Sequence, residues 1–440
     1  MYAIGLALQL VVVTNTTVID PSTGRATPGQ AILINGSRVQ SIAPAARATI
    51  PASALRIDGQ GKFVIPGLWD MHVHNDVPGG GALLPLYVAY GVTGVRDMDG
   101  RLAPLRAWQK EIQGGTRVGP RMVISGPYIV GQRVPLPSLT VTTPAEGRAA
   151  VDSLAALGVD FIKVHNGMTP DTYFAVARRA RERGIVFAGH VFNGVTPVQA
   201  SDSGQRSEEH LSGFPNECTV TDSARLAAAH PLHRFLLGGC TTRSQEASYR
   251  RLAANGTWVT PTLIVQQPVA AFQPSVARGD RLSTFFSDSL LAMMSIVMPI
   301  PRDATPLHRT LGLVMYDKRI AMVGALSRAG VPLLTGSDTP VAPAVPGEAI
   351  HEELALMVRG GLTPLEALRA ATWEPARYLN ATDSLGTIAA GKVADLVVLD
   401  ANPLLDIANV RRVHAVVSNG RAFDRAALDA LIAAARVRQP

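Results

Sequence analysis

The chain has 440 residues, of which 47% are hydrophobic and 17% charged, a composition typical of a globular protein with one large domain and a smaller one. The formal net charge of +7 comes mainly from arginines spread along the chain, since only five lysines occur. No basic stripe with interleaved aromatic residues is present, which argues against nucleic-acid binding. No apolar run approaches the roughly 20 residues of a membrane span, so we expect none.

The sequence is compatible with more than one cellular compartment for the protein. The segment Met1–Val13 is apolar but lacks a basic start and a small-residue cleavage site. It fits either a shortened signal peptide of an exported or periplasmic protein or the first strand of a cytoplasmic one. The two cysteines, Cys218 and Cys240, fit either reduced packing residues or a local disulfide in an exported protein.

A β-only pattern opens the chain. The run Val11–Ile19 is rich in β-branched residues, and Ala31–Asn35 is followed by an Asn-Gly turn signal. No helical period occurs here. Residues 1–60 are therefore predicted to form a small β unit, too small to bury a core alone.

Apolar strands and helices alternate from residue 61 to about 360, which is the signature of a parallel β/α architecture. Eight such units in about 300 residues favour a closed (β/α)8 TIM barrel over an open sheet, and we place this barrel at residues 61–380. Helices are expected between most strands, as at Pro144–Leu157, Asp171–Arg183 and Tyr316–Arg328. The predicted strands are Phe63–His74, Val92–Met98, Arg121–Tyr128, Phe161–His165, Ile185–His190, Gln205–Leu211, Thr257–Leu263 and Val331–Asp338.

The end of the chain returns to strand chemistry. The sequence Thr363-Pro-Leu-Glu366 is a capping box with proline at the first helical position, which predicts a helix to about Leu379. Because both chain ends are rich in strands, we expect residues 1–60 and 381–440 to pair into one composite β-sandwich domain beside the barrel. The last predicted elements are strands within Leu385–Leu399 and Val410–Ser418 and a helix at Arg425–Arg436.

The stretch Phe63–His74 carries the first chemical signal, because it ends in two histidines separated by one residue, His72 and His74. Side chains at positions i and i+2 of a strand lie on the same face, so both imidazoles are expected to emerge side by side. Paired imidazoles suit zinc, copper, iron or nickel, and zinc is the commonest of these in hydrolysis. Taken alone, the motif also fits two ordinary strand-end histidines.

Further polar residues end other predicted strands, where apolar strands do not need them. A buried lysine, histidine or aspartate without a partner costs several kcal/mol, so each is expected to be paired or bound to a metal ion. In a parallel barrel these strand ends meet at one mouth. The sequence therefore predicts a metal site there, formed by His72, His74, Lys163, His190, His210 and Asp338.

Three other residues near the strand ends are candidates for substrate contacts. His165 lies two residues beyond Lys163 on the same strand face, where it would touch substrate or support the site from behind. Arg96 and Tyr128, near the ends of the second and third strands, are candidates for binding a substrate carboxylate. His351 opens a helix near the mouth and is expected to support the fold.

These residues, in this order, resemble the metal-dependent amidohydrolase superfamily. Within it they are most similar to the imidazolonepropionase-like, prolidase-like branch, which includes Xaa-Pro dipeptidases, N-acyl-amino-acid hydrolases and ochratoxin-type amidases. The resemblance covers nearly the whole chain. It rests on Val64–His74, on Gly336-Ser-Asp338 and on the closing run Gly386–Asp400.

The resemblance implies two divalent metal ions, with zinc as the first choice. Lys163 would bridge both ions as a carbamate formed with carbon dioxide, since a desolvated lysine beside cations has a lowered pKa and a reactive neutral amine. The alternative for Lys163 is a cation paired with Asp338, in a site that holds one metal ion. The implied ligand sets are His72, His74 and Asp338 for the more buried ion, and His190 and His210 for the outer ion.

The reaction that the resemblance implies is hydrolysis of a peptide-like amide bond. A hydroxide bridging the metal ions would attack the carbonyl carbon, and Asp338 would act as general acid/base that delivers the proton to the leaving nitrogen. The expected substrate is a small molecule: an N-acyl amino acid, a dipeptide such as Xaa-Pro, or an ochratoxin-like amide. The superfamily often forms dimers or larger rings, so a homo-oligomer is an open expectation.

Other functions remain as alternatives. A deaminase of the superfamily would place a carboxylate three residues after His190, but position 193 is asparagine, which together with Lys163 disfavours it. A cyclic-amide or imidazolone hydrolase uses the same chemistry with a different pocket. The alternative of another class is a non-catalytic metal-binding barrel, against which the intact set of six candidate ligands argues.

Overall fold

The computed structural model describes residues 10–134, 136–192, 194–214, 242–270, 280–297, 305–341 and 344–437. Cys218, Cys240 and most of the segment Met1–Val13 lie outside these ranges, and with them the predicted disulfide and signal-peptide alternatives. Within these ranges, no helix combines the length and the apolar character needed to cross a bilayer.

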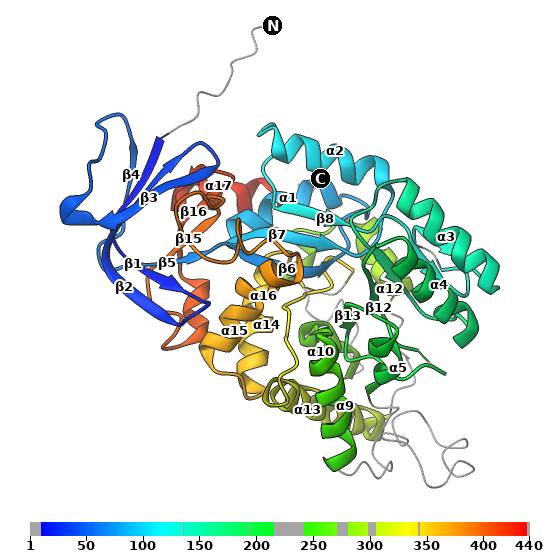
Figure 1. The fold of residues 1–440 in the computed structure, drawn as a ribbon. Helices are drawn as coiled ribbons and strands as arrows, with labels where there is room; N and C mark the ends of the chain where they lie inside the picture. The colour runs from blue at the N-terminus through cyan, green and yellow to red at the C-terminus, as the bar shows by residue number, and fades with distance from the viewer. Residues whose placement is uncertain are drawn as a thin grey trace, which may run out of the picture.

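One mixed sheet joins the two ends of the chain. Strand β15 (Leu396–Leu399) pairs antiparallel with β5 (Phe63–Pro66), which in turn lies parallel to β1 (Leu10–Asp20). Figure 1 shows the orange C-terminal strands beside the blue N-terminal ones. The predicted association of the two chain ends thus takes the form of one eight-stranded sheet. Its remaining strands are β2 (Arg25–Asn35), β3 (Arg38–Pro44), β4 (Leu55–Asp58), β16 (Val413–Ser418) and β17 (Arg421–Phe423).

The two faces of this sheet contribute to different hydrophobic clusters. In β15, Leu396 and Val398 belong to a cluster made only of residues from the chain ends. Val397 and Leu399 belong instead to the main core cluster, which also contains Leu68 of the parallel strands. This alternation follows from the two-residue period of a strand. The mixed sheet therefore packs on the rest of the protein through a shared core.

The parallel strands of the described residues form two sheets. The α/β class predicted from the sequence is confirmed, but these strands do not form one continuous eight-stranded ring. The three-stranded sheet contains β6 (Leu68–Val73), β7 (Val92–Asp97) and β8 (Arg121–Ile124). The six-stranded sheet contains β10 (Ser138–Thr140), β9 (Tyr128–Val130), β11 (Ile162–Val164), β12 (Phe187–Gly189), β13 (Ser207–Glu209) and β14 (Trp258–Thr260), in this order.

Single contacts link the two parallel sheets. The segment predicted as the eighth strand, Val331–Asp338, is not a regular strand, but this segment and the next residue, Thr339, bridge the sheets through one isolated β-bridge each. On the opposite side, the backbone N–H of Asp160 donates to the Ile124 carbonyl at 3.0 Å. Complete barrel closure stays a prediction. The two bridges pair Leu333 with Val259 and Thr339 with Val73.

The predicted strand Phe63–His74 is two strands in different sheets, which corrects the sequence-based boundary. The chain leaves the mixed sheet at Gly67, whose backbone N–H donates to the Asp395 carbonyl at 2.8 Å. A Cβ atom at position 67 would lie 2.0 Å from Thr93 Oγ1, so only glycine fits where the chain passes β7. After this break the chain continues as β6, which carries the two histidines and belongs to the three-stranded parallel sheet.

The helix predicted from Thr363 to Leu379 is also interrupted. It forms α15 (Pro364–Ala370) and α16 (Trp373–Tyr378), and two carbonyls at the end of α15 accept hydrogen bonds from distant backbone N–H groups. The Trp69 N–H donates to the Ala371 carbonyl at 2.8 Å. The Thr335 N–H donates to the Ala370 carbonyl at 3.1 Å.

Helices cover the outside of the parallel strands (Figure 1). The predicted helix Pro144–Leu157 ends one residue earlier than expected, and the capping box of Thr143 and Glu146 starts it. The remaining helices are α1 (Gly80–Ala89), α2 (Leu102–Gln113), α3 (Pro144–Ala156), α4 (Pro170–Glu182), α5 (Pro197–Asp202), α9 (Thr242–Asn255), α10 (Leu263–Ala270), α11 (Asp280–Ser283), α12 (Asp288–Val297), α13 (Pro306–Arg328), α14 (Glu348–Arg359) and α17 (Arg425–Ala434), with short 3-10 turns at Ala45–Arg47 and Ile407–Arg411.

Candidate metal centre

Four imidazoles from three strand ends converge in the parallel part of the molecule. His72 and His74, at the end of β6, have ring centroids 5.3 Å apart. His210 follows β13 and lies 4.4 Å from the ring of His72, and His190 follows β12 and lies 4.7 Å from the ring of His210. The order of strands in the sheets therefore brings together residues that lie far apart in the sequence.

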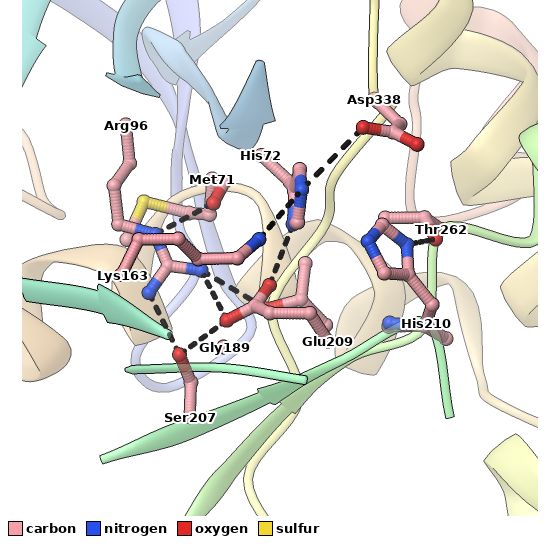
Figure 2. Close-up of polar contacts among 12 residues, drawn as sticks. Met71, His72, Arg96, Lys163, Gly189, Ser207, Glu209, His210, Thr262 and Asp338 are labelled. Carbon is pink, nitrogen blue, oxygen red and sulfur yellow. Dashed lines mark hydrogen bonds and ion pairs between the residues drawn. The ribbon is translucent and has the colours of Figure 1, made fainter. Parts of the chain in front are cut away.

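Lys163 and Asp338 face the same imidazoles. Lys163 is 1% exposed, and its Nζ lies 3.5 Å from His72 Nε2. Asp338 Oδ1 lies 3.4 Å from His72 Nε2 and 2.9 Å from His74 Nε2. Figure 2 shows Lys163, Asp338 and His210 around His72. The potential ligand atoms of His72, His210 and Asp338 all lie within 4.8 Å of one another, a spacing that one metal ion can span. The structure thus places all six predicted ligands in one region.

Each of the four imidazoles has its second ring nitrogen held by a protein oxygen. His72 Nδ1 lies 2.8 Å from Glu209 Oε2, and His210 Nδ1 lies 2.6 Å from Thr262 Oγ1. Such outer partners fix the tautomer and the orientation of metal-binding histidines, leaving Nε2 for the metal. The other two pairs are His74 Nδ1 with Asp99 Oδ1, and His190 Nδ1 with Asn166 Oδ1 at 3.1 Å.

The partner of His72 is itself held by a buried arginine. Arg96 Nη2 donates to Glu209 Oε1 at 2.8 Å, and both side chains are fully buried. The other donors of Arg96 are satisfied by Met71 O and Ser207 Oγ, among other acceptors. Figure 2 shows this network behind His72. The Glu209 carboxylate is therefore fixed from one side by a guanidinium while it holds His72 from the other.

A buried carboxylate also ties β6 to the segment that carries Asp338. Asp70 Oδ1 accepts the backbone N–H groups of His72 at 3.3 Å and Ser337 at 3.0 Å. Asp70 Oδ2 accepts the Ser337 hydroxyl. Gly336 allows this close approach, since a Cβ atom there would lie 2.7 Å from His72 Cβ. The irregular segment at Asp338 is thus aligned with β6 although it is no regular strand.

Four non-glycine residues at these strand ends adopt positive φ angles. They lie in the left-handed region, which costs a residue with a Cβ atom about 1–2 kcal/mol. Backbone strain of this kind is typical of functional sites. The four residues are His210 (φ 65°), Leu211 (φ 54°), Thr262 (φ 46°) and Asp338 (φ 58°).

Burial favours the neutral form of His72, His190 and His210, in which an imidazole can bind a cation. It lowers the pKa of Lys163 to about 8 and that of His210 to about 4, and it lowers the pKa of His190 well below the usual value. These imidazoles are therefore neutral near pH 7, with a lone pair free. Burial acts to raise the pKa of Asp338, but His210 and His74 outweigh it, so the pKa falls and the carboxylate stays ionised.

His74 differs from the other imidazoles. Burial lowers its pKa, but the carboxylates of Asp99 and Asp338 outweigh burial and raise the pKa to about 10. Without a metal ion the ring therefore carries a proton between two carboxylates. A cation that takes this place must release that proton, which makes binding at His74 pH-dependent.

Of the predicted substrate contacts, His165 and Tyr128 lie beside the site. The ring of His165 stacks on Tyr128 with centroids 4.9 Å apart and lies 4.0 Å from the ring of His190. His165 Nδ1 is buried without a hydrogen-bond partner among the described residues, and burial lowers the pKa of this histidine to about 3. His351 lies elsewhere and donates to the Tyr90 carbonyl at 2.8 Å, as expected of a residue that supports the fold.

Arg96 does not have the environment expected of a substrate contact. Its side chain is fully buried, and its donors bond to protein acceptors that include Glu209. The structure therefore argues against the predicted bond to a substrate carboxylate. The Arg96 guanidinium lies behind the site, where it holds Glu209. It therefore has no free face for a ligand.

Four residues of the site were missed by sequence reasoning. They are the oxygen partners of the imidazoles, and they come from loops and strands with no fixed spacing to the histidines. Only Glu209 gave a usable signal, because an acidic residue beside His210 at the end of a buried strand needs a partner. The four residues are Asp99, Asn166, Glu209 and Thr262.

Comparison with known proteins assigns the family. The sequence profile of the amidohydrolase family matches residues 63–423, which is most of the chain. The chain belongs to the amidohydrolase family. The family consists of hydrolytic enzymes, so the prediction of an enzyme of this class is confirmed. A segment of 95 residues is 39% identical to ochratoxinase of Aspergillus niger; it covers 21% of this chain and only 19% of that enzyme.

Solved structures of other amidohydrolases resemble nearly the whole chain. A bottromycin amidohydrolase is 24% identical with a TM-score of 0.74, over 96% of this chain and 88% of its own. A Xaa-Pro dipeptidase is 20% identical with a TM-score of 0.70, over 94% and 100%. The A. niger ochratoxinase structure is 19% identical with a TM-score of 0.66, over 95% and 96%. These relatives agree with the prolidase-like branch predicted from the sequence.

Proposed function

We propose that this amidohydrolase cleaves the amide bond of a small, peptide-like substrate at a centre with two metal ions. The candidate substrates are an N-acyl amino acid, a dipeptide such as Xaa-Pro, or an ochratoxin-like amide. The observation that carries the proposal is the convergence of four oriented imidazoles with Lys163 and Asp338. Relatives described as a Xaa-Pro dipeptidase and an ochratoxinase support the choice of substrate class.

The donor set fits divalent cations, with zinc as the first choice for imidazole ligands. His190 Nε2 is buried and has no hydrogen-bond partner in the part of the chain that the structure describes, while Asn166 holds the other nitrogen of the ring. A buried lone pair in this state is suited to a metal ion. His72, His74 and Asp338 would hold one ion and His190 and His210 the other, and Lys163 would contribute to both.

Lys163 is proposed to act as a carbamate. Its burial and lowered pKa leave part of its amine neutral, and a neutral amine adds carbon dioxide to form a carbamate anion. The carbamate anion has two oxygens that can bind metal ions, whereas the protonated lysine is itself a cation. The conversion would offset the charge of two metal ions next to side chains that are buried, such as His72.

Divalent ions held by the four imidazoles, Lys163 and Asp338 would supply a Lewis acid that polarises the amide carbonyl and lowers the pKa of the attacking water. Asp338 is ionised and lies beside His72 and His74, where it accepts the proton of that water. It then gives the proton to the amide nitrogen as the carbon–nitrogen bond breaks. The water oxygen ends in the new carboxylic acid, and the other product is an amine.

The test is turnover by the zinc-loaded protein, together with its metal content. We expect about two metal ions per chain and hydrolysis of N-acyl amino acids or dipeptides. Asp338→Asn should remain folded and lose about 10²- to 10⁴-fold in kcat. Activity only on hydantoins or imidazolones would replace the proposal by cyclic-amide hydrolysis. No turnover on linear or cyclic amides and esters would contradict catalysis altogether.

A further inference from the structure

A cavity of about 600 Å³ opens beside His190 and His210. Part of its wall is apolar, including Met168 and Phe192. Among the described residues that line it, none is a carboxylate, and one carries a permanent charge, Arg319 of α13. The cavity therefore joins two predicted metal ligands to a single cationic side chain.

Arg319 lacks a counter-charge within the described part of the chain. Among the described residues its Nε is buried without a hydrogen-bond partner, and burial lowers the pKa of its guanidinium with no carboxylate of these residues to offset this effect. By contrast, the buried Arg96 is paired with Glu209. Even for a partly buried side chain such as Arg319, a guanidinium shielded from water without an anion is unfavourable. An anion supplied by a ligand would remove this cost.

Hydrogen bonds hold the Arg319 guanidinium in a fixed position relative to the candidate metal centre. Arg319 Nη1 donates to Gln266 Oε1 at 2.6 Å. Gln266 Nε2 in turn donates to the carbonyl of His210 at 3.1 Å and to that of Pro261 at 2.7 Å. One amide side chain thus connects Arg319 to the backbone of a predicted metal ligand. Such a fixed arrangement suits a substrate held at two points.

We propose that Arg319 binds the carboxylate of the substrate, so that the enzyme acts on amides that carry a free carboxylate. This inference rests on the proposed function and assigns the residue that recognises the carboxylate shared by its candidate substrates. The guanidinium can hold a carboxylate through two parallel hydrogen bonds. The apolar wall at Met168 and Phe192 would then accept an apolar group of the same substrate.

The test compares two substrates that share one scissile bond, N-acetyl-L-phenylalanine and its C-terminal carboxamide. Arg319→Met should lower kcat/KM for the acid about 10- to 100-fold, because charge-assisted hydrogen bonds are lost. It should change kcat/KM for the carboxamide less than about twofold. Arg319→Lys keeps the charge without the paired donors and should fall between the wild type and Arg319→Met.

The matched control is Arg309→Met. Arg309 is exposed on the same helix, about 15 Å from Arg319 along the helix axis, and does not line the cavity. Its loss removes the same charge from α13, so both substrates should keep their wild-type kcat/KM. Thermal unfolding of all variants shows whether α13 stays in place.

Equilibrium binding separates this inference from the proposed function. Calorimetry with the acid and the carboxamide, in an Asp338→Asn background that blocks turnover, measures recognition alone. Tighter binding of the acid that disappears in Arg319→Met supports the inference even if neither compound is hydrolysed. Three results would overturn the inference, whether or not amides are hydrolysed. Arg319→Met could weaken binding of the acid and the carboxamide equally, or weaken neither. The parent protein could also bind neither compound.

Discussion

The buried pair of Arg96 and Glu209 determines how His72 is presented to the centre of the site. Glu209 accepts from Arg96 on one oxygen and contacts His72 on the other. Neither side chain is exposed, so water cannot replace a missing partner. The effect of a substitution here should therefore combine loss of metal affinity with loss of stability.

We expect Glu209→Gln to weaken metal binding about 10- to 100-fold, because the outer partner of His72 loses its charge. The free energy of unfolding should fall by about 3–5 kcal/mol, since Arg96 is left buried without a counter-ion. Metal titration and urea denaturation of the metal-free protein measure the two effects separately.

A double variant, Arg96→Met with Glu209→Gln, provides the check on this prediction. It should be less destabilised than the sum of the two single variants, because the unpaired charge is gone. Strict additivity of the unfolding free energies would show that the pair is not coupled.

Lys163→Ala should lose about one metal ion per chain and most of the hydrolytic activity, if Lys163 joins the two ions. A short carboxylic acid added with zinc should restore part of both, since it can take the place of the carbamate. The exposed Lys110 on α2 provides the control, and Lys110→Ala should keep full metal content. Full metal content in Lys163→Ala, measured by elemental analysis, would rule out the bridging role.

The sequence indicates candidate ligands better than it indicates the residues that hold them. His72 and His74 stand out because paired imidazoles suit a metal ion and further polar residues end the other predicted strands. Asp99 and Asn166 do not, since an acid or an amide in a loop after a strand is common. Arg319 was also missed, because it lies on the long helix α13 and enters the site only through the packing of that helix.

At the scale of elements, one helix provides the N-terminal cap of another. Glu353 of α14 accepts the backbone N–H groups of Leu263 and Ile264, each at 2.9 Å. These are the first residues of α10, whose N–H groups have no partner within that helix. Burial raises the pKa of Glu353 to about 8, against the effect of the two N–H donors. The cap therefore stabilises the fold in a pH-dependent way.

Below pH 4.5 Glu353 is protonated in both the folded and the unfolded chain. Between pH 4.5 and 8 the unfolded chain releases this proton while the folded chain keeps it, so the free energy of unfolding falls as the pH rises. The slope from this group is at most about 1.4 kcal/mol per pH unit.

We expect Glu353→Gln to lose most stability relative to the wild type at pH 5.5 and least at pH 8.5, because the glutamine does not titrate. Urea denaturation at several pH values measures the difference, and other titrating groups cancel because both proteins contain them. A difference that stays constant with pH would contradict the raised pKa.

Element positions were predictable where the local pattern is complete. The strand at Val92 and the helix at Pro144 lie within about one residue of their predicted bounds. The breaks at Gly67 and between α15 and α16 were not predictable, because they depend on hydrogen bonds to distant partners, Asp395 and Trp69. The irregular segment before Asp338 likewise follows from bonds to Asp70 rather than from its own apolar pattern.

At the scale of the whole molecule, the mixed sheet and the parallel strands share one core. Leu399 is fully buried and belongs to the same cluster as Leu68, whereas the four tryptophans all lie between residues 69 and 373. Tryptophan fluorescence therefore reports on the middle of the chain and not on its ends. A shared core predicts that both parts unfold together.

Leu399→Ala should lower the free energy of unfolding by about 2–5 kcal/mol through the cavity that it leaves. Tryptophan fluorescence and far-ultraviolet circular dichroism should shift to the same new midpoint, although Leu399 lies in the sheet formed by the chain ends. Leu405→Ala, at a position 82% exposed, should change neither signal. Separate midpoints for the two signals in Leu399→Ala would show that the chain ends unfold independently.

The positive φ angles at His210, Leu211, Thr262 and Asp338 bear on how this enzyme could be evolved in the laboratory. Glycine at His210, Thr262 or Asp338 would relieve backbone strain, so a screen for heat resistance should recover such substitutions. These three positions, however, carry a candidate ligand or its partner, and glycine there would remove the proposed chemistry. Leu211 offers no such exchange, because its side chain is fully buried in the main core cluster and glycine would leave a cavity there. Selection for heat resistance and selection for turnover therefore favour different residues at the other three positions.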